Sequence, residues 1–147
     1  MRLRFALLLC VFPLMAADPP GFVIWSAANI KGVEKKLEGQ KFASQQLDKF
    51  GNHYTMLAHR EGDGSAELHE TEADIFVVET GAAMLIVGGE MVDGKRTAPH
   101  EIRGPSIKGG VEHKIGPGDI VHIPAKTPHQ LIVGKGKFTY FVVKVGQ

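Results

Sequence analysis

From His53 onward, the chain is a succession of short apolar stretches separated by glycine-containing turns, and this pattern limits its fold more than any other feature. The turn signals include Gly88-Gly89 and Asp93-Gly94. Many short strands at regular spacing are typical of a sandwich or barrel, so we predict an all-β domain over residues 53–147. The expected strands cover 54–60, 65–69, 74–79, 82–87, 90–92, 111–115, 120–123, 129–133 and 138–145.

One segment interrupts this pattern. Lys95 to Gly110 is polar and contains two prolines and three glycines. We predict a long irregular loop there, with one short strand near Glu101 to Arg103. Loops of this length in compact domains are often functional.

The residues before the barrel have helical rather than strand-like periodicity. Ser26 is suited to cap a helix over Ala27 to Leu37, in which Ile30, Val33 and Leu37 lie roughly on one face. Lys41 to Phe50 is a second amphipathic stretch with imperfect spacing. We therefore predict a short N-terminal helical arm over residues 18–52.

The first 17 residues have the organisation of a signal peptide. Arg2 and Arg4 give a basic start, an apolar run follows from Phe5 to Met15, and Ala16-Ala17 is a small-residue end. The run is shorter than the roughly 20 residues that a membrane-spanning helix needs. We expect cleavage near Ala17 and a periplasmic or secreted mature protein without a stable membrane anchor; an uncleaved hydrophobic arm is the alternative.

Composition narrows the chemistry of the mature chain. Its only cysteine, Cys10, lies in the predicted signal peptide, so disulfides, thiolate nucleophiles and cysteine metal ligands are excluded after cleavage. Losing Arg2 and Arg4 changes the formal charge from +1 to about −1. No basic surface remains to favour nucleic acid as a partner.

Two stretches carry residues that suit a metal ion. Glu67 and His69 stand one residue apart on an expected strand, so their side chains share a face, and Asp74 opens the next strand. His129 begins a strand much later, with apolar residues on its own face. Two imidazoles and two carboxylates suit one borderline divalent metal.

The spacing of these residues resembles the cupin family. The first cupin motif is matched by Glu67-x-His69, then Asp74 after four residues and Gly81 after six more. The second motif is matched by Pro117-Gly118-Asp119 and by Pro124 to His129. The resemblance covers Tyr54 to Val145 and implies a double-stranded β-helix, or jelly-roll barrel, with Glu67, His69, Asp74 and His129 at the four ligand positions.

Three departures from the family pattern bear on the metal. Glu67 replaces the first histidine, Asp74 replaces a glutamate, and Lys126 replaces the motif glycine. Carboxylates are hard ligands, which favours Mn or Fe(II) with Zn as a further option. The alternative is a decayed site in which Glu67 and Asp74 are polar rim residues; Asp74 is the least secure ligand, because it could instead cap the turn before its strand.

Other residues fall near the site in the motif frame. His122 could line the pocket as an acid or base, although a wall or surface position is its ordinary role. Tyr140 could reach inward from the last strand, although core packing is the default for such a residue.

The resemblance leaves two classes of function open. The first is an exported metalloenzyme of dioxygenase, decarboxylase or isomerase type that acts on a small organic molecule. The second is a non-catalytic cupin that binds or senses a small molecule, with or without metal; a storage role is a weaker third option. Cupins commonly pair, so the resemblance also implies a homodimer.

Overall fold

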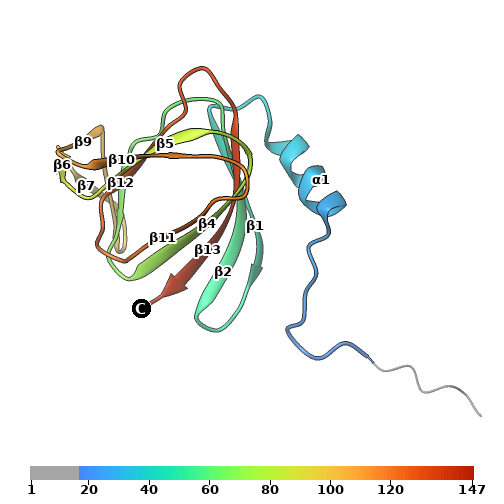
Figure 1. The fold of residues 1–147 in the computed structure, drawn as a ribbon. Helices are drawn as coiled ribbons and strands as arrows, with labels where there is room; N and C mark the ends of the chain where they lie inside the picture. Colours follow the sequence, from blue (N-terminus) through green and yellow to red (C-terminus); the bar gives the residue numbers. More distant parts are fainter. Residues whose placement is uncertain (1–16) are drawn as a thin grey trace, which may run out of the picture.

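We describe residues 17–147 from a computed structural model (Figure 1). The signal peptide predicted over residues 1–17 therefore lies almost entirely outside the described residues. Within residues 17–147, no helix is both long and apolar enough to cross a membrane.

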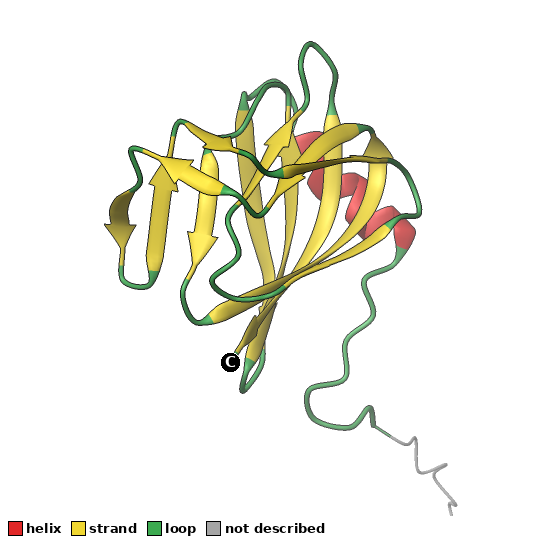
Figure 2. Cartoon of the chain, turned by 60° about the vertical axis from the view of Figure 1, so that its left-hand side comes forward, coloured by secondary structure: helices red, strands yellow, loops and turns green. Residues whose placement is uncertain are grey.

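In the described part of the chain, nearly all of the regular structure is antiparallel strand, wound into a barrel with one helix outside it (Figures 1 and 2). One sheet has the order β1-β2-β13-β4-β11, the other has the order β10-β5-β12-β3-β8-β7, and β6 pairs with β9 beside them. The elements are α1 (Ala27–Leu37), β1 (Phe42–Lys49), β2 (His53–Arg60), β3 (Ala66–His69), β4 (Glu72–Gly81), β5 (Ala83–Val87), β6 (Glu90–Val92), β7 (Lys95–Ala98), β8 (Glu101–Gly104), β9 (Ser106–Lys108), β10 (Val111–Ile115), β11 (Ile120–Ile123), β12 (His129–Ile132) and β13 (Phe138–Gly146).

The helix is where the sequence predicted it. Ser26 caps α1, because its hydroxyl accepts a hydrogen bond from the Asn29 amide at 3.2 Å. Two lysines in the last turn face the negative end of the helix dipole. Only Leu37 of the helix is buried, in keeping with the position of α1 on the outside of the barrel (Figure 2).

The arm is not helical throughout, which corrects the prediction for residues 41–50. Phe42–Lys49 is strand β1, which pairs with β2 from Phe42 opposite Arg60 to Lys49 opposite Tyr54. An unpaired β2 would leave a row of backbone groups at the sheet edge, and β1 satisfies them. This pairing outweighs the weak helical periodicity, so β1 belongs to the barrel and the helical arm ends at Leu37.

The segment 95–110 is also more ordered than predicted. It forms three short strands rather than an irregular loop with one strand: β7 pairs with β8, and β9 pairs with β6. Strand β8 lies against β3 and sets Arg103 opposite Glu67 and Glu101 opposite His69. The pairing of β8 with β3 thus brings two further charged residues to the predicted metal site.

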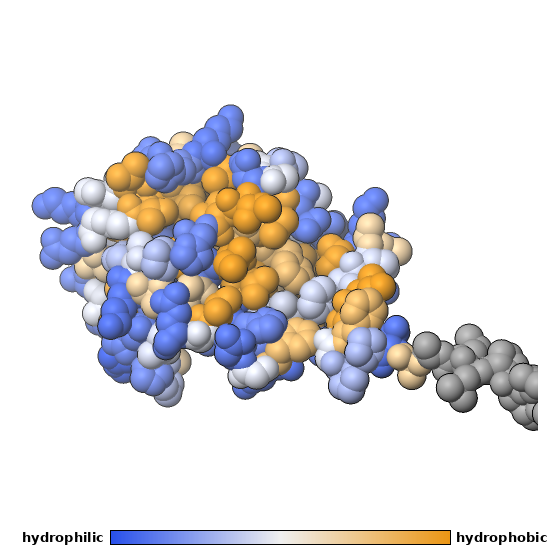
Figure 3. All heavy atoms as spheres, turned by 60° about the horizontal axis from the view of Figure 1, so that its bottom comes forward, coloured by the Kyte–Doolittle hydropathy of each residue, from blue (hydrophilic) through white to orange (hydrophobic). Residues whose placement is uncertain are grey.

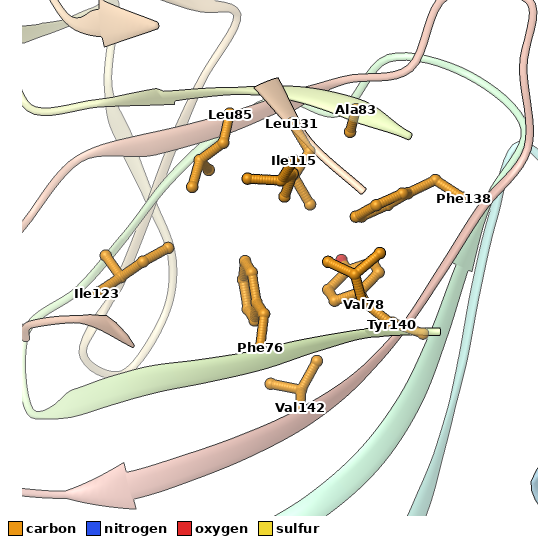
Figure 4. Close-up of a cluster of buried hydrophobic side chains, with 11 residues drawn as sticks. Phe76, Val78, Ala83, Leu85, Ile115, Ile123, Leu131, Phe138, Tyr140 and Val142 are labelled. Carbon is orange, nitrogen blue, oxygen red and sulfur yellow. The ribbon is translucent and has the colours of Figure 1, made fainter. Parts of the chain in front are cut away.

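The apolar core is a cluster of buried side chains inside the barrel (Figure 4). Along β13, Phe138, Tyr140 and Val142 alternate toward this core, and Lys144 is the next residue in the same alternation. The remaining buried members of the cluster come from six other strands: Ala58, Phe76, Val78, Ala83, Leu85, Ile115, Ile123 and Leu131.

Candidate metal centre

The fold brings the four predicted ligand residues together from three strands. Glu67 and His69 lie on β3, Asp74 lies on β4, and His129 is paired with Glu67 at the start of β12. One ligand atom each from Glu67, His69 and His129 lie within 4.8 Å of one another. Asp74 Oδ2 lies 3.3 Å from His69 Nε2 and 3.5 Å from His129 Nε2. The two imidazoles and Asp74 are buried.

Hydrogen bonds orient both imidazoles. His69 Nδ1 lies 2.9 Å from Glu101 Oε2, and His129 Nδ1 lies 3.1 Å from the Thr127 carbonyl oxygen. With each Nδ1 directed at its acceptor, each Nε2 is the ring nitrogen that faces the barrel interior. This is the arrangement by which proteins prepare histidine for a metal.

Two arginines hold Glu67. Its Oε1 accepts hydrogen bonds from Arg60 at 3.0 Å and from Arg103 at 2.9 Å, while its Oε2 lies 3.8 Å from His69 Nε2. Arg60 is itself fixed, because its Nε donates to the Tyr140 hydroxyl at 3.2 Å. One oxygen of Glu67 is thus positioned by the protein and the other is free to face the ligand atoms of the histidines.

Lys144 enters the same cluster from β13, where it is paired with Asp74. Its Nζ lies 2.7 Å from Asp74 Oδ1 and 2.6 Å from His69 Nε2. Two charged nitrogens cannot lie this close, so a single proton joins Nζ and Nε2. Lysine is almost never buried without a partner, and at 9% exposure Lys144 has its partner in Asp74.

The charges in the cluster perturb its pKa values. Burial opposes ionisation of Asp74, but the hydrogen bond from His129 and the charge of Lys144 keep the pKa of that carboxyl far below its usual range. The hydrogen bond from His69 lowers the pKa of Glu101 to about 2. The site therefore holds Asp74 and Glu101 in their ionised form.

A cavity of about 190 Å³ adjoins these residues. His129 borders a much smaller neighbouring void instead. Tyr140 lines both spaces, whereas His122 is exposed on β11 and lines a separate outer depression, so the structure does not bring His122 to the cavity. The residues that line the cavity are Phe42, Ser44, Tyr54, Met56, Ala58, Arg60, Glu67, His69, Asp74, Phe76, Glu101, Arg103, Tyr140, Val142 and Lys144.

The donor set fits a divalent metal ion. Two imidazole nitrogens and a carboxylate converge, and each donor is oriented by a hydrogen bond from behind. Asp74 is close to both imidazoles but is also engaged by Lys144. Glu67, His69 and His129 would therefore hold the ion, and such sites are compatible with several first-row metals.

Sequence reasoning did not identify Arg60, Glu101, Arg103 or Lys144 as site residues. Lys144 left a detectable signal, because it continues the inward alternation of an otherwise apolar strand. The two residues of β8 left none, since their position depends on pairing with β3.

Known structures show the same architecture. A protein with a double-stranded β-helix domain from Klebsiella pneumoniae matches with a TM-score of 0.59 at 15% identity, covering 84% of this chain and 89% of that one. A cupin superfamily protein from Desulfitobacterium hafniense matches at 0.50 and 15%, covering 75% and 81%. The DMSP lyase DddQ from Ruegeria pomeroyi matches at 0.52 and 18%, covering 73% of this chain but only 48% of the lyase.

No protein-family model matches the sequence, and a search of curated proteins found no match. Identities this low establish architecture and not activity. The barrel, its strand order and these structural neighbours together show that the chain has the cupin fold, as its sequence motifs predicted.

Proposed function

We propose that this protein is a metal-binding cupin that takes a small anionic organic molecule into its barrel. The observation that carries the proposal is the convergence of His69, His129 and Glu67, with both Nε2 atoms turned inward by acceptors behind the rings. Histidines that served only to fill the core would not need this common orientation.

The charge of the site supports an anionic ligand. Three cationic side chains, Arg60, Arg103 and Lys144, face three carboxylates, which are Glu67, Asp74 and Glu101. These charges balance, so a bound divalent ion would leave the site positive. An anionic oxygen on the ligand would offset that charge.

The cavity limits the size of the ligand. A volume of about 190 Å³ is below the roughly 300–1,000 Å³ of typical ligand pockets, so only a small molecule fits. Phe42, Met56, Phe76 and Val142 give part of its wall an apolar character. A small carboxylic acid with a short apolar portion satisfies both the volume and the lining.

If the protein is an enzyme, its side chains would have separable tasks. A metal in the site would supply a Lewis acid. The Tyr140 phenol, whose pKa burial raises to about 12, keeps its proton at neutral pH and serves as a fixed neutral group. Arg103, with a side chain 36% exposed, is the cation best placed to meet a ligand on entry. A dioxygenase, decarboxylase or isomerase reaction remains a prediction from the family resemblance.

Metal analysis of the purified protein tests the proposal. We expect close to one equivalent of Mn, Fe or Zn, lost in Glu67→Ala and His129→Ala. His122→Ala is the matched control, because it removes an exposed histidine outside the cavity and should retain the metal. Wild-type protein that takes up no metal after dialysis against each ion would contradict the proposal.

A metal-free binding cupin is the second candidate, and Lys144 is the observation that favours it. Its Nζ supplies a positive charge at the ligand cluster without any ion. Binding of sodium malonate by chelator-treated protein would distinguish the two candidates. Equal affinity with and without metal would favour the metal-free function.

We also propose that the protein is exported, as its basic start and apolar run suggest. Mass spectrometry of the protein produced in a bacterial host tests this. We expect a periplasmic product that begins near Asp18. A full-length cytosolic product would favour the uncleaved hydrophobic arm instead.

A further inference from the structure

We propose that Lys144 competes with a metal ion for His69 and thereby sets the metal affinity of the site. This inference rests on the proposed metal-binding function and concerns how that same site is regulated. It assigns a role to a residue that lies outside both metal motifs in the sequence.

The competition concerns a single atom, His69 Nε2. A metal ligated by an imidazole lies about 2.0–2.1 Å from the nitrogen and uses its lone pair. In this structure the lone pair of His69 Nε2 faces Lys144 Nζ at 2.6 Å. The amine and an ion cannot both use that lone pair, so binding of an ion requires Lys144 to leave.

The position of Lys144 is built into the fold. Its backbone is paired with that of Asp74 in the central part of a sheet, and Nζ is held at 2.7 Å by Asp74 Oδ1. The adjoining cavity gives the displaced amine space without unfolding the strand. Lys144 therefore acts as a tethered cation that a metal must displace, with Asp74 as its anchor.

The same geometry explains why only three of the four predicted ligands form the candidate metal set. Glu67, His69 and His129 form a converging set, while Asp74 is held by Lys144. Removing the amine should therefore strengthen binding to the three converging ligands. A lysine that only neutralised Asp74 would act through that carboxylate, so its removal would tighten metal binding only while Asp74 is present.

Titration calorimetry with Mn²⁺ and Zn²⁺ tests the inference. We expect Lys144→Met, which keeps an unbranched side chain out to the ε position and removes the amine, to bind metal about tenfold more tightly or better. Lys137→Met is the matched control, because Lys137 pairs with Glu61 on the outside and its loss should leave the affinity unchanged. Affinity in Lys144→Met that equals or falls below wild type would overturn the inference.

A second pair of variants guards against misfolding, since Lys144→Met leaves Asp74 buried beside an apolar side chain. Asp74→Asn with Lys144→Met has no unpaired charge and should bind metal more tightly than Asp74→Asn alone. The reverse order in protein with a cooperative thermal transition would count against competition.

The outcomes also separate this inference from the proposed function. If wild type binds no metal but Lys144→Met does, competition is supported and native metal binding fails. If wild type binds metal and Lys144→Met binds it no better, native metal binding stands and competition fails. If neither binds metal, both fail.

Discussion

The two ends of the barrel interior are built from the same strands but from opposite chemistry. On β13 the inward positions pass from Phe138, Tyr140 and Val142 to Lys144. On β4 the inward positions pass in the reverse direction along the chain, from Asp74 to Phe76 and Val78. Because the two strands are antiparallel, apolar positions meet apolar positions at one end, and Asp74 meets Lys144 at the other.

This difference separates the part of the barrel interior that stabilises the fold from the part that carries the candidate site. The apolar end provides the burial that stabilises a barrel. The charged end buries groups that apolar residues could replace at little or no cost in stability. Such local conflict is typical of a functional site, and here it is confined to one end of the barrel. Each of the predictions below changes one end or the outer wall and leaves the other parts intact.

The largest effect should come from the apolar end. Phe138 is fully buried, and its ring packs 5.0 Å from that of Tyr140. Phe138→Ala should lower the free energy of unfolding by about 3–5 kcal/mol, measured by urea denaturation. Phe22→Ala, at a 52% exposed position, is the control and should change it by less than about 0.5 kcal/mol. The metal affinity of folded Phe138→Ala should match wild type, and a loss there would show that the two ends are coupled.

The next effect should come from breaking the ion pair at the charged end. Asp74→Ala leaves the buried Lys144 amine without its carboxylate and should cost about 3 kcal/mol in unfolding free energy. The double variant Asp74→Asn with Lys144→Met removes both charges and should recover most of that loss. Equal instability of the single and double variants would mean that packing, rather than the unpaired charge, sets the cost.

The sequence predicted much of the fold for physical reasons that can be stated. Strands β2 to β6 and β10 to β13 are bounded by turn residues and carry apolar side chains, so their signals are local. The four predicted ligand residues were grouped because a strand alternates faces and because the spacing resembles the family motifs. All four lie in one cluster, and three of them share the distances that a metal ion needs.

The failures have a common cause, which is pairing between distant segments. Strand β1 has weak intrinsic preference and forms because β2 offers it an edge. Strand β8 forms against β3 and thereby brings Glu101 and Arg103 to the site. His122 alternates to the outer face of β11, which no spacing argument had decided. Such long-range contacts cannot be read from local periodicity.

Tyr140 lies at the boundary between the two ends and should show a smaller effect. Its ring packs on Phe76 at 4.9 Å, and its hydroxyl accepts a hydrogen bond from Arg60. Tyr140→Phe keeps the ring and should cost about 1 kcal/mol, through the unpaired Arg60 donor. Tyr54→Phe, which removes a longer contact of 3.3 Å to Glu72, is the control and should cost less. A larger loss of unfolding free energy in Tyr54→Phe than in Tyr140→Phe would contradict the position of Tyr140 at the boundary between the two ends.

The smallest effect should come from the outer wall, where a carboxylate is fixed without being buried. Glu61 accepts hydrogen bonds from the Gly39 amide and from Lys137, and these lower the pKa of Glu61 from its ordinary 4.5 to about 2. Because the folded pKa is depressed, this stabilisation is complete above about pH 4.5 and disappears as the pH falls to about 2.

Thermal melts of Glu61→Gln between pH 7 and pH 2 measure this contribution. The variant should melt slightly below wild type at neutral pH, and the two curves should converge in acid. Glu90→Gln, at an exposed position on β6, should follow wild type throughout. A constant gap between Glu61→Gln and wild type at every pH would show that the charge of Glu61 is immaterial. Convergence would show that the ionised carboxylate of Glu61 causes the gap, and a small gap at neutral pH would make the outer wall the weaker of the two charged regions.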